Sequence, residues 1–274
     1  MSPAEPMTPS DSSSDRVATP VAGDGRERVL ALDTLTSRLV AAALVLLMDA
    51  VGYHLVGLST DTSQAHSLRF WLDDRIPFLP WTVYLYSWVY TAMLYPLFVV
   101  RCSGLFRRTV EAYAITIAVS LAVFAAFPVT SVGFRPDPAT LDQSVFHNWG
   151  VALTFFVDPP TNLFPSLHLS VATLAALIAW RARPLFGWCA APMVLAVAVS
   201  ITTMKQHFVL DGVGALAVAL FAFRTRIASF DEKRDATGPL AYSWRGPVGY
   251  LVFHGLVYLG LYAAFRAGFR PWDG

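Results

Sequence analysis

Residues 185–223 read LFGWCAAPMVLAVAVSITTMKQHFVLDGVGALAVALFAF, two apolar blocks joined by a short polar turn. The first block is Leu185–Met204 and the second is Phe208–Phe223, and Asp211 is the only charged side chain in either. A helix needs about 20 apolar residues to cross the hydrocarbon core of a bilayer. The pattern therefore predicts two consecutive membrane helices that meet at a turn containing Lys205 and His207.

The same kind of apolar block recurs along the chain, and the composition agrees with it. Of 274 residues, 55% are hydrophobic and 14% are charged, against roughly 25% charged in soluble domains. We expect an all-α, polytopic transmembrane helix bundle of six to seven spans. The further spans are predicted at Leu39–Leu58, Pro80–Val100, Val110–Phe127, Pro165–Trp180 and Pro247–Phe265.

The alternation of polar and apolar stretches predicts four segments. Residues 1–34 have the composition of a disordered cytosolic tail and not of a signal peptide, because no small-residue cleavage site follows the hydrophobic block. We expect the main membrane domain at 35–226, a cytosolic loop at 227–246, and an additional transmembrane helix with a tail at 247–274. Residues 66–81 and 142–157 have the aromatic and amphipathic character of segments that lie along the membrane surface.

Charge and cysteine content argue against nucleic-acid binding and against a cysteine-based metal site. A net charge of +1, with no stretch rich in Lys or Arg, argues against binding to nucleic acid. Cys102 and Cys189 have neither the spacing of a metal site nor an obvious way to pair. We interpret them as two free, buried thiols.

The distribution of Lys and Arg predicts the orientation, since cytoplasmic loops retain these residues in excess. With the amino terminus in the cytosol, 14 of the 20 fall on the cytosolic side: Arg16, Arg26, Arg28, Arg38, Arg101, Arg107, Arg108, Arg181, Arg183, Arg224, Arg226, Lys233, Arg234 and Arg245. The other six are Arg69, Arg75, Arg135, Lys205, Arg266 and Arg270. The loop after span Val110–Phe127 and the turn before Phe208–Phe223 are therefore expected on the extracytoplasmic side.

One polar cluster opens an outward-facing helix and reads Asn162-Leu163-Phe164-Pro165-Ser166-Leu167-His168. Pro165 suits the first turn of a helix, where its missing N–H is no loss. The free backbone N–H groups of such a turn form an anion site, to which Ser166 adds a hydroxyl and His168 an imidazole. The alternative is a capped helix whose histidine only reaches the membrane surface.

A second polar cluster lies at the turn within residues 185–223. His207 and Asp211 are four residues apart, so on a helix they share a face, where the carboxylate orients the imidazole and stabilises its charged form. Lys205 adds a compact positive charge nearby. The alternative is an ordinary membrane-surface histidine with a helix-capping aspartate, although ionisable groups near lipid are costly and usually functional.

A third cluster, Gly133-Phe134-Arg135-Pro136, follows the Val110–Phe127 span. Arg135 has the planar guanidinium that grips a phosphate through two hydrogen bonds. The three clusters are far apart in sequence, and the Lys and Arg distribution places all of them on one side. Their convergence indicates a single site.

These residue types supply the groups that phosphoryl transfer requires, namely a nucleophile, a proton donor and fixed positive charge. We predict that His207, oriented by Asp211, is the nucleophile and forms a phosphohistidine. His168 would protonate the leaving alcohol and then activate the acceptor. The predicted phosphate ligands are backbone amides of the Pro165–Trp180 span and the side chains of Arg135, Asn162, Ser166 and Lys205. No metal or other cofactor is expected, since no carboxylate cluster is present to hold one.

At these residues the chain resembles the type 2 phosphatidic acid phosphatase superfamily, and within it the branch similar to inositol phosphorylceramide synthases. Pro165-Ser166-Leu167-His168 matches the branch's form of the second family signature. Ser200, His207 and Asp211 match the spacing of the third, which adds Ser200 to the implied phosphate ligands. The resemblance extends from about Asp73 to Phe223, includes the run Asp74–Trp81, and implies a six-helix phosphatase-like core.

Two positions depart from the family pattern. The first signature keeps Arg135-Pro136, but its usual lysine is replaced by Pro128, and Ile201 stands where the third signature has arginine. Two phosphate-binding cations of the family are thus missing, and Lys205 is a candidate to replace one. The departures bear on substrate preference more than on the histidine chemistry.

Three hypotheses follow. The first is an integral membrane phosphatase of lipid or polyprenyl phosphates, with its site on the extracytoplasmic face of the cell membrane. The second is a headgroup transferase in which a lipid alcohol or polyol replaces water as acceptor; both enzymes share the first half-reaction. The third is a non-catalytic transporter or scaffold whose polar clusters only stabilise the bundle. The expected partners are a membrane lipid substrate and, for the transferase, a polyol or lipid acceptor; the sequence does not indicate the oligomeric state.

Overall fold

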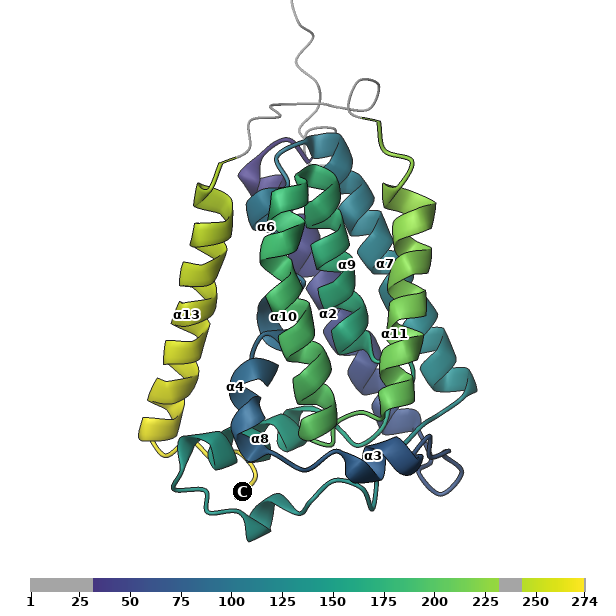
Figure 1. Cartoon of the computed structure of the whole chain (residues 1–274), viewed down its shortest axis with the longest axis vertical. Coiled ribbons are helices and arrows are strands. Elements are labelled where there is room, and N and C mark those ends of the chain that lie inside the picture. Colours follow the sequence, from purple (N-terminus) through teal and green to yellow (C-terminus); the bar gives the residue numbers. More distant parts are fainter. Residues whose placement is uncertain (1–31, 232–242, 274) are drawn as a thin grey trace, which may run out of the picture.

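The computed structural model describes residues 32–231 and 243–273. The tail predicted at 1–34 and the loop predicted at 227–246 therefore lie largely outside the described residues. Within these ranges the fold is an all-α bundle, as predicted from the apolar blocks (Figure 1). The cations of the predicted cytosolic set that fall outside the described residues are Arg16, Arg26, Arg28, Lys233 and Arg234.

Most of the predicted spans form long helices. They are α2 (Leu35–Ser59), α7 (Ser103–Ala126), α9 (Leu167–Ala182), α10 (Pro184–Thr203), α11 (Val209–Ala222) and α13 (Arg245–Arg266). Among the described residues, α2, α7, α10 and α13 are long and apolar enough to cross a membrane by length and composition. The shorter α9 has 16 residues and α11 has 14, and α11 continues into a π-helical turn, η3 (Phe223–Ile227).

The predicted span Pro80–Val100 is not one helix. It consists of η1 (Pro80–Thr82), α4 (Val83–Tyr86), α5 (Val89–Ala92) and α6 (Tyr95–Val99). Two features interrupt it: Pro96 has no N–H to donate to the preceding turn, and the Ser87 hydroxyl donates to the carbonyl of Tyr84 at 2.8 Å. Irregular backbone at membrane depth is tolerated where protein buries it, and Tyr86, Thr91 and Ala92 are fully covered.

Short elements close one end of the bundle, at the bottom of Figure 1, which we call the loop end. The two predicted surface segments contain α3 (Trp71–Arg75) and α8 (Phe146–Val157), and η2 (Pro138–Thr140) lies between α7 and α8. A small apolar cluster of Val129, Leu163 and Phe208 ties three loops together there. The loop end therefore brings residues 66–81, 128–164 and 204–208 into one layer.

Helix α9 lies at the centre of the bundle, where it packs against α10, α11 and α7. Its alanines Ala172, Ala175 and Ala179 are completely buried, so the neighbouring backbones approach closely. Small residues at helix contacts are the usual basis of packing in lipid, where apolar burial against lipid tails gives no driving force. This central position fixes the first turn of α9 within the loop end.

The prediction of two buried thiols is wrong for one of them. Cys102 is completely buried at the start of α7, but Cys189 is exposed on α10. The apolar blocks predict that a residue lies at membrane depth, but they do not predict whether it faces the other helices or the lipid.

Helix α13 stands at the edge of the bundle, packed on α6 and α8. His254 stacks on Trp88 with ring centroids 3.8 Å apart and pairs with Thr91 at 2.9 Å. Beyond the helix, the carbonyl of Phe269 accepts a hydrogen bond of 2.7 Å from the indole of Trp149 in α8. The carboxyl-terminal segment thus holds α8 in place at the loop end.

The contact of α9 with α10 yields a stability prediction. A Cβ atom at Gly187 would lie 2.6 Å from Trp180 Cβ and 2.7 Å from Trp180 Cα, closer than real contacts allow. Gly187→Ala should push the two helices apart and cost about 1–3 kcal/mol, as overpacking does. Thermal unfolding in detergent should show a lower Tm for Gly187→Ala, and no loss for Gly255→Ala, where the added atom meets open space. Equal Tm values for the two variants would contradict this packing.

Candidate active site

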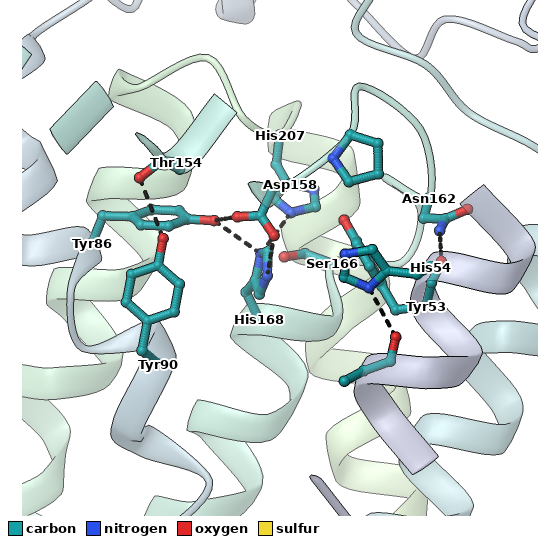
Figure 2. Close-up of polar contacts among 12 residues, drawn as sticks. Tyr53, His54, Tyr86, Tyr90, Thr154, Asp158, Asn162, Ser166, His168 and His207 are labelled. Atoms are coloured by element: carbon teal, nitrogen blue, oxygen red, sulfur yellow. Dashed lines mark hydrogen bonds and ion pairs between the residues drawn. The ribbon is translucent and has the colours of Figure 1, made fainter. Parts of the chain in front are cut away.

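A continuous chain of polar side chains crosses the loop end beneath the surface (Figure 2). His168 Nδ1 lies 3.3 Å from His207 Nε2. His207 Nδ1 in turn lies 3.2 Å from Asp211 Oδ2. On the other side of His168, its Nε2 lies 3.8 Å from Asp158 Oδ1, and the Tyr86 hydroxyl donates to Asp158 Oδ2 at 2.6 Å. Each imidazole therefore contacts the other and has a carboxylate near its second ring nitrogen. His168 Nδ1 also lies 3.4 Å from the Tyr86 hydroxyl.

His207 lies in the tight turn between α10 and α11. The backbone N–H groups of Gln206 and His207 both donate to the carbonyl of Ile201, at 3.0 and 2.9 Å. Lys205 adopts a left-handed conformation with φ of 59°, which costs a non-glycine residue about 1–3 kcal/mol unless its surroundings hold it. The turn thus fixes the backbone from which the His207 ring projects.

Asp211 holds His207 by a route other than the predicted shared helix face. His207 precedes α11, whose first helical residue is Val209, so the two residues are not on one helix. Instead the Asp211 carboxylate turns back over the helix start, where Oδ2 accepts the N–H of Phe208 at 2.8 Å as well as contacting His207 Nδ1. The predicted partnership exists, although the helical geometry assumed for it was wrong.

His168 is placed by the start of α9. This helix begins at Leu167, with Ser166 as its amino-terminal cap, so Pro165 precedes the helix and does not lie in its first turn as predicted. The Ser166 hydroxyl accepts from the N–H of Leu169 at 3.4 Å, and the Ser166 N–H donates to the carbonyl of Asp211 at 3.0 Å. The two histidine-bearing segments are thereby joined through their backbones as well as their rings.

Arg135 reaches the same site from the loop after α7. Its Nη1 and Nη2 donate to the carbonyls of Asp158 and Pro159, at 2.6 and 3.3 Å, and its guanidinium lies over the Phe155 ring. The positive charge of Arg135 interacts with both histidines. The structure therefore brings Arg135, His168, His207 and Asp158 together.

Lys205 points elsewhere. Its ammonium group donates to the carbonyls of Asp73 and Ile76 in and after α3, at 2.8 and 2.5 Å, and lies over the Phe134 ring. Asp73 in turn accepts the N–H of Val209 at 2.8 Å. These contacts strap α3 across the α10–α11 turn, so the position of Lys205 is that of a structural cation.

The remaining predicted ligands are buried near this layer but already have backbone partners. Asn162 donates to the carbonyl of Tyr53 at 2.7 Å and has a left-handed φ of 61°. Ser200, in the last turn of α10, donates to the carbonyl of Val197 at 3.1 Å. Their roles as phosphate ligands stay predictions.

Sequence reasoning missed Asp158 and Tyr86. Asp158 caps the carboxyl end of α8, and Tyr86 lies in α4 within the interrupted span Pro80–Val100. An acid directly after an amphipathic helix, followed by two prolines, was the one available signal for Asp158. Only the folded chain shows that it faces His168.

Several buried polar atoms around the site have no hydrogen-bond partner within the described part of the protein. Such atoms are rare in folded proteins, because an unpaired buried polar group is costly. At the loop end they are Ser131 Oγ, Arg135 Nε, Thr161 Oγ1, Asn162 Oδ1, the side-chain amide of Gln206 and Asp211 Oδ1. Their grouping next to the histidines is suited to a polar ligand.

Burial sets the charge of His207. It lowers the pKa of His207 to about 3, and the positive charge of Arg135 adds to this effect. At neutral pH the ring is therefore uncharged. With its Nδ1 proton directed to Asp211, the Nε2 lone pair faces His168, which is the state a nucleophilic imidazole requires.

An open pocket of about 400 Å³ adjoins Arg135 on the outer side of the loop end. Aromatic side chains form part of its wall, and Ser131, whose hydroxyl is one of the unpaired buried groups, also lines it. Lining side chains include Ser131, Arg135, Gln143, Phe155, Phe156 and Trp272. The pocket has room for a group much larger than water.

The placement of Lys205 gives a testable distinction. Lys205→Met removes two hydrogen bonds from a charged group to α3, each worth about 1.5–3 kcal/mol. We expect a clearly lower Tm, while Arg75→Met, at an exposed cation on the same α3, leaves Tm unchanged within error. If Lys205→Met instead keeps the Tm of wild type and loses affinity for phosphate esters, Lys205 is a phosphate ligand, as the sequence predicts. Its hydrogen bonds to α3 would then contribute little to stability.

Fold and site together define a class: an integral membrane protein made of helices, with two carboxylate-partnered histidines at one end of the bundle. A profile of the PAP2 superfamily matches residues 59–225, which is more than half of the chain. The chain therefore belongs to the PAP2 superfamily, whose members are generally phosphatases and related phosphotransferases. Comparisons with curated proteins and with solved structures find no match.

Proposed function

We propose that this protein is a membrane hydrolase that removes phosphate from a lipid or polyprenyl phosphate through a phosphohistidine intermediate. The observation that carries the proposal is the contact of 3.3 Å between His168 Nδ1 and His207 Nε2. A nucleophile and a proton donor must both reach one phosphoryl group. Here the two ring nitrogens that would play these roles, His207 Nε2 and His168 Nδ1, face each other. Membership of the PAP2 superfamily agrees with this chemistry.

In the first half-reaction, His207 Nε2 donates its lone pair to phosphorus. As the N–P bond forms, the P–O bond to the lipid breaks, and its electron pair stays on the leaving oxygen. His168, which the negative charge of the bound phosphate ester favours in its doubly protonated form, gives its Nδ1 proton to that oxygen, so the lipid departs as a neutral alcohol. Asp211 stabilises the positive charge that develops on the His207 ring.

In the second half-reaction, His168 is neutral and acts as the base. It takes a proton from water, the water oxygen attacks phosphorus, and the N–P bond breaks to return the lone pair to His207. Inorganic phosphate leaves, and His168 is again protonated. Both rings end in the state in which they began.

Positive charge and N–H donors around the rings support binding of the phosphoryl oxygens. Arg135 is held at the carbonyls of Asp158 and Pro159, its charge acts on both histidines, and its Nε has no protein partner among the described residues. The first-turn N–H groups of α9 next to Ser166 form the anion site expected at a helix start. Asn162, Ser200 and Lys205 stay proposed ligands of lower rank, because their side chains already bond to backbone carbonyls.

An extracytoplasmic site is supported by the charges at the two ends of the bundle. The end opposite the loop end carries Arg38, Arg101, Arg107, Arg108, Arg181, Arg183, Arg224, Arg226 and Arg245. Since cytoplasmic ends retain excess Lys and Arg, we propose that the loop end, with the histidines, faces the extracytoplasmic side of the cell membrane.

A second function, phosphoryl transfer to an alcohol, is favoured by one observation. The pocket of about 400 Å³ beside Arg135 exceeds what a water molecule needs. Its aromatic wall and its hydroxyl, amide and guanidinium groups suit a polyol or the headgroup of a lipid alcohol. Such an acceptor would replace water in the second half-reaction.

Product analysis tests the function. Purified wild type, supplied with a panel of lipid and polyprenyl phosphates, should release inorganic phosphate, and His207→Ala and His168→Ala should each reduce the rate by about 10²–10⁴-fold or more. His147→Ala, a histidine at the loop end outside the polar chain, serves as control and should retain activity. The Tm of each variant must match that of wild type, so that a lower rate reflects lost chemistry and not unfolding.

Three other results would replace this proposal. A new phosphate ester of an added polyol or lipid alcohol, formed in place of inorganic phosphate, would establish the transferase. Absence of any phosphate release or transfer by wild type would favour a transporter or scaffold. Activity of His207→Ala equal to wild type would rule out the phosphohistidine route.

Cysteine labelling tests the orientation. In a Cys189→Ser background, which removes the exposed native thiol, Val132→Cys lies on an exposed part of the loop end and Ala228→Cys lies exposed at the opposite end. A membrane-impermeant maleimide should label Val132→Cys in intact cells and Ala228→Cys only after the membrane is opened. The reverse pattern would place the site in the cytosol.

A further inference from the structure

We propose that Asp158 is the positioning residue of the proton donor, holding His168 as Asp211 holds His207. This inference rests on the proposed function and adds to it a residue outside the matched sequence motifs. Asp158 is 6% exposed, and its carboxylate lies between Tyr86 and His168 (Figure 2). The site then contains two His–carboxylate pairs, His207–Asp211 for the nucleophile and His168–Asp158 for the proton donor.

The backbone and one carboxylate oxygen of Asp158 are firmly held. Its N–H donates to the carbonyl of Thr154 at 2.8 Å, and its own carbonyl accepts from Arg135 at 2.6 Å. Oδ2 accepts the Tyr86 hydroxyl at 2.6 Å. Oδ1 is the oxygen turned toward His168, and the restraints on the rest of the residue fix its direction.

The distances around His168 indicate why it needs this partner. With 3.3 Å between His168 Nδ1 and His207 Nε2, no phosphorus atom fits in line between the rings, since phosphoryl transfer needs the attacking and leaving atoms on opposite sides of phosphorus. The rings must separate when substrate binds. On the far side, the gap of 3.8 Å to Asp158 Oδ1 is about 1 Å longer than a charge-assisted hydrogen bond.

His168 can therefore exchange one partner for another. As the phosphoryl group replaces the contact with His207, the His168 ring moves toward Asp158 and closes the longer gap. Nε2–H then donates to the carboxylate, and Nδ1–H is left facing the leaving oxygen. The negative charge of Asp158 favours the doubly protonated ring, which the buried site by itself would disfavour.

Other titratable groups around this pair act on it as well, and a pH experiment must take them into account. Arg135 and His207 oppose a positive charge on His168, while Asp158 favours it. The further groups that face His168 or Asp158 are Asp49 and Tyr53 of α2, Tyr86 of α4 and Tyr90 of α5. Among these neighbours, Asp158 Oδ1 is the carboxylate oxygen in contact with the ring.

The leaving group provides the sharpest test, because a proton donor matters only when the departing oxygen needs a proton. Asp158→Asn keeps the size of the side chain and removes the charge. For an alkyl phosphate it should lower kcat/KM by about 10²-fold, the usual contribution of general acid catalysis. For a nitrophenyl phosphate, whose phenolate leaves without a proton, the loss should be much smaller.

Matched variants separate positioning from folding. Asp158→Glu retains the carboxylate and should recover part of the alkyl phosphate activity. Asp142→Asn changes an exposed acid of the loop end and should behave as wild type. His207→Ala should lose activity to the same extent on the alkyl phosphate and on the nitrophenyl phosphate, since both reactions need the nucleophile. Equal losses on both substrates for Asp158→Asn, or no loss on either, would overturn the proposal.

A second readout does not depend on turnover. In the full-length protein with ¹⁵N-labelled histidine, the His168 ring should lose its proton at lower pH in Asp158→Asn than in wild type, with Asp142→Asn unchanged. An unaltered His168 titration would contradict the pairing. If wild type hydrolyses neither phosphate ester, the proposed function fails, whereas the titration still decides whether Asp158 holds His168.

Discussion

One carboxylate oxygen, Oδ2 of Asp211, holds together the start of a helix and the ring of a histidine. It accepts the Phe208 N–H, which would otherwise be an unpaired donor at the first turn of α11, and it contacts His207 Nδ1. Asp211 is completely buried, so both contacts lie away from water, where polar interactions are strong and unpaired groups are costly. Removing this carboxylate would loosen the turn and the nucleophile at once.

Elsewhere in the loop end, other polar groups also join a helix end to a neighbouring segment. Ser166 caps α9 and also donates its N–H to the Asp211 carbonyl. Lys205 and Asp73 hold α3 against the α10–α11 turn. Arg135 donates to the carbonyl of Asp158 at the end of α8. Helix ends leave N–H and C=O groups unpaired, and here those groups anchor the side chains of the site. The polar side chains of this layer are therefore paired mainly with backbone groups at helix ends, so the apolar bundle can hold them without many additional charged partners.

Sequence periodicity was sufficient for the class of fold, because a long apolar block has few stable arrangements in lipid other than a helix. It failed at Pro80–Val100, where prolines and hydroxyl side chains break the helix into short turns, and at Cys189, whose side of the helix it did not predict. The pairing of His207 with Asp211 was predicted correctly, but for a helical geometry that the α10–α11 turn does not have. Pro165 lies two residues before Leu167, the first helical residue of α9, and not in the first turn as predicted.

The sequence by itself determined an all-α membrane bundle, its family, and the residue types and spacing of the histidine motifs, because each of these depends on neighbours within a few turns of one chain segment. Only the tertiary structure decided that His168 and His207 meet, that Lys205 bonds to α3, and that Asp158 and Tyr86 join the site. These contacts link segments between 39 and 132 residues apart. Their geometry depends on how the helices pack, which local sequence pattern does not specify.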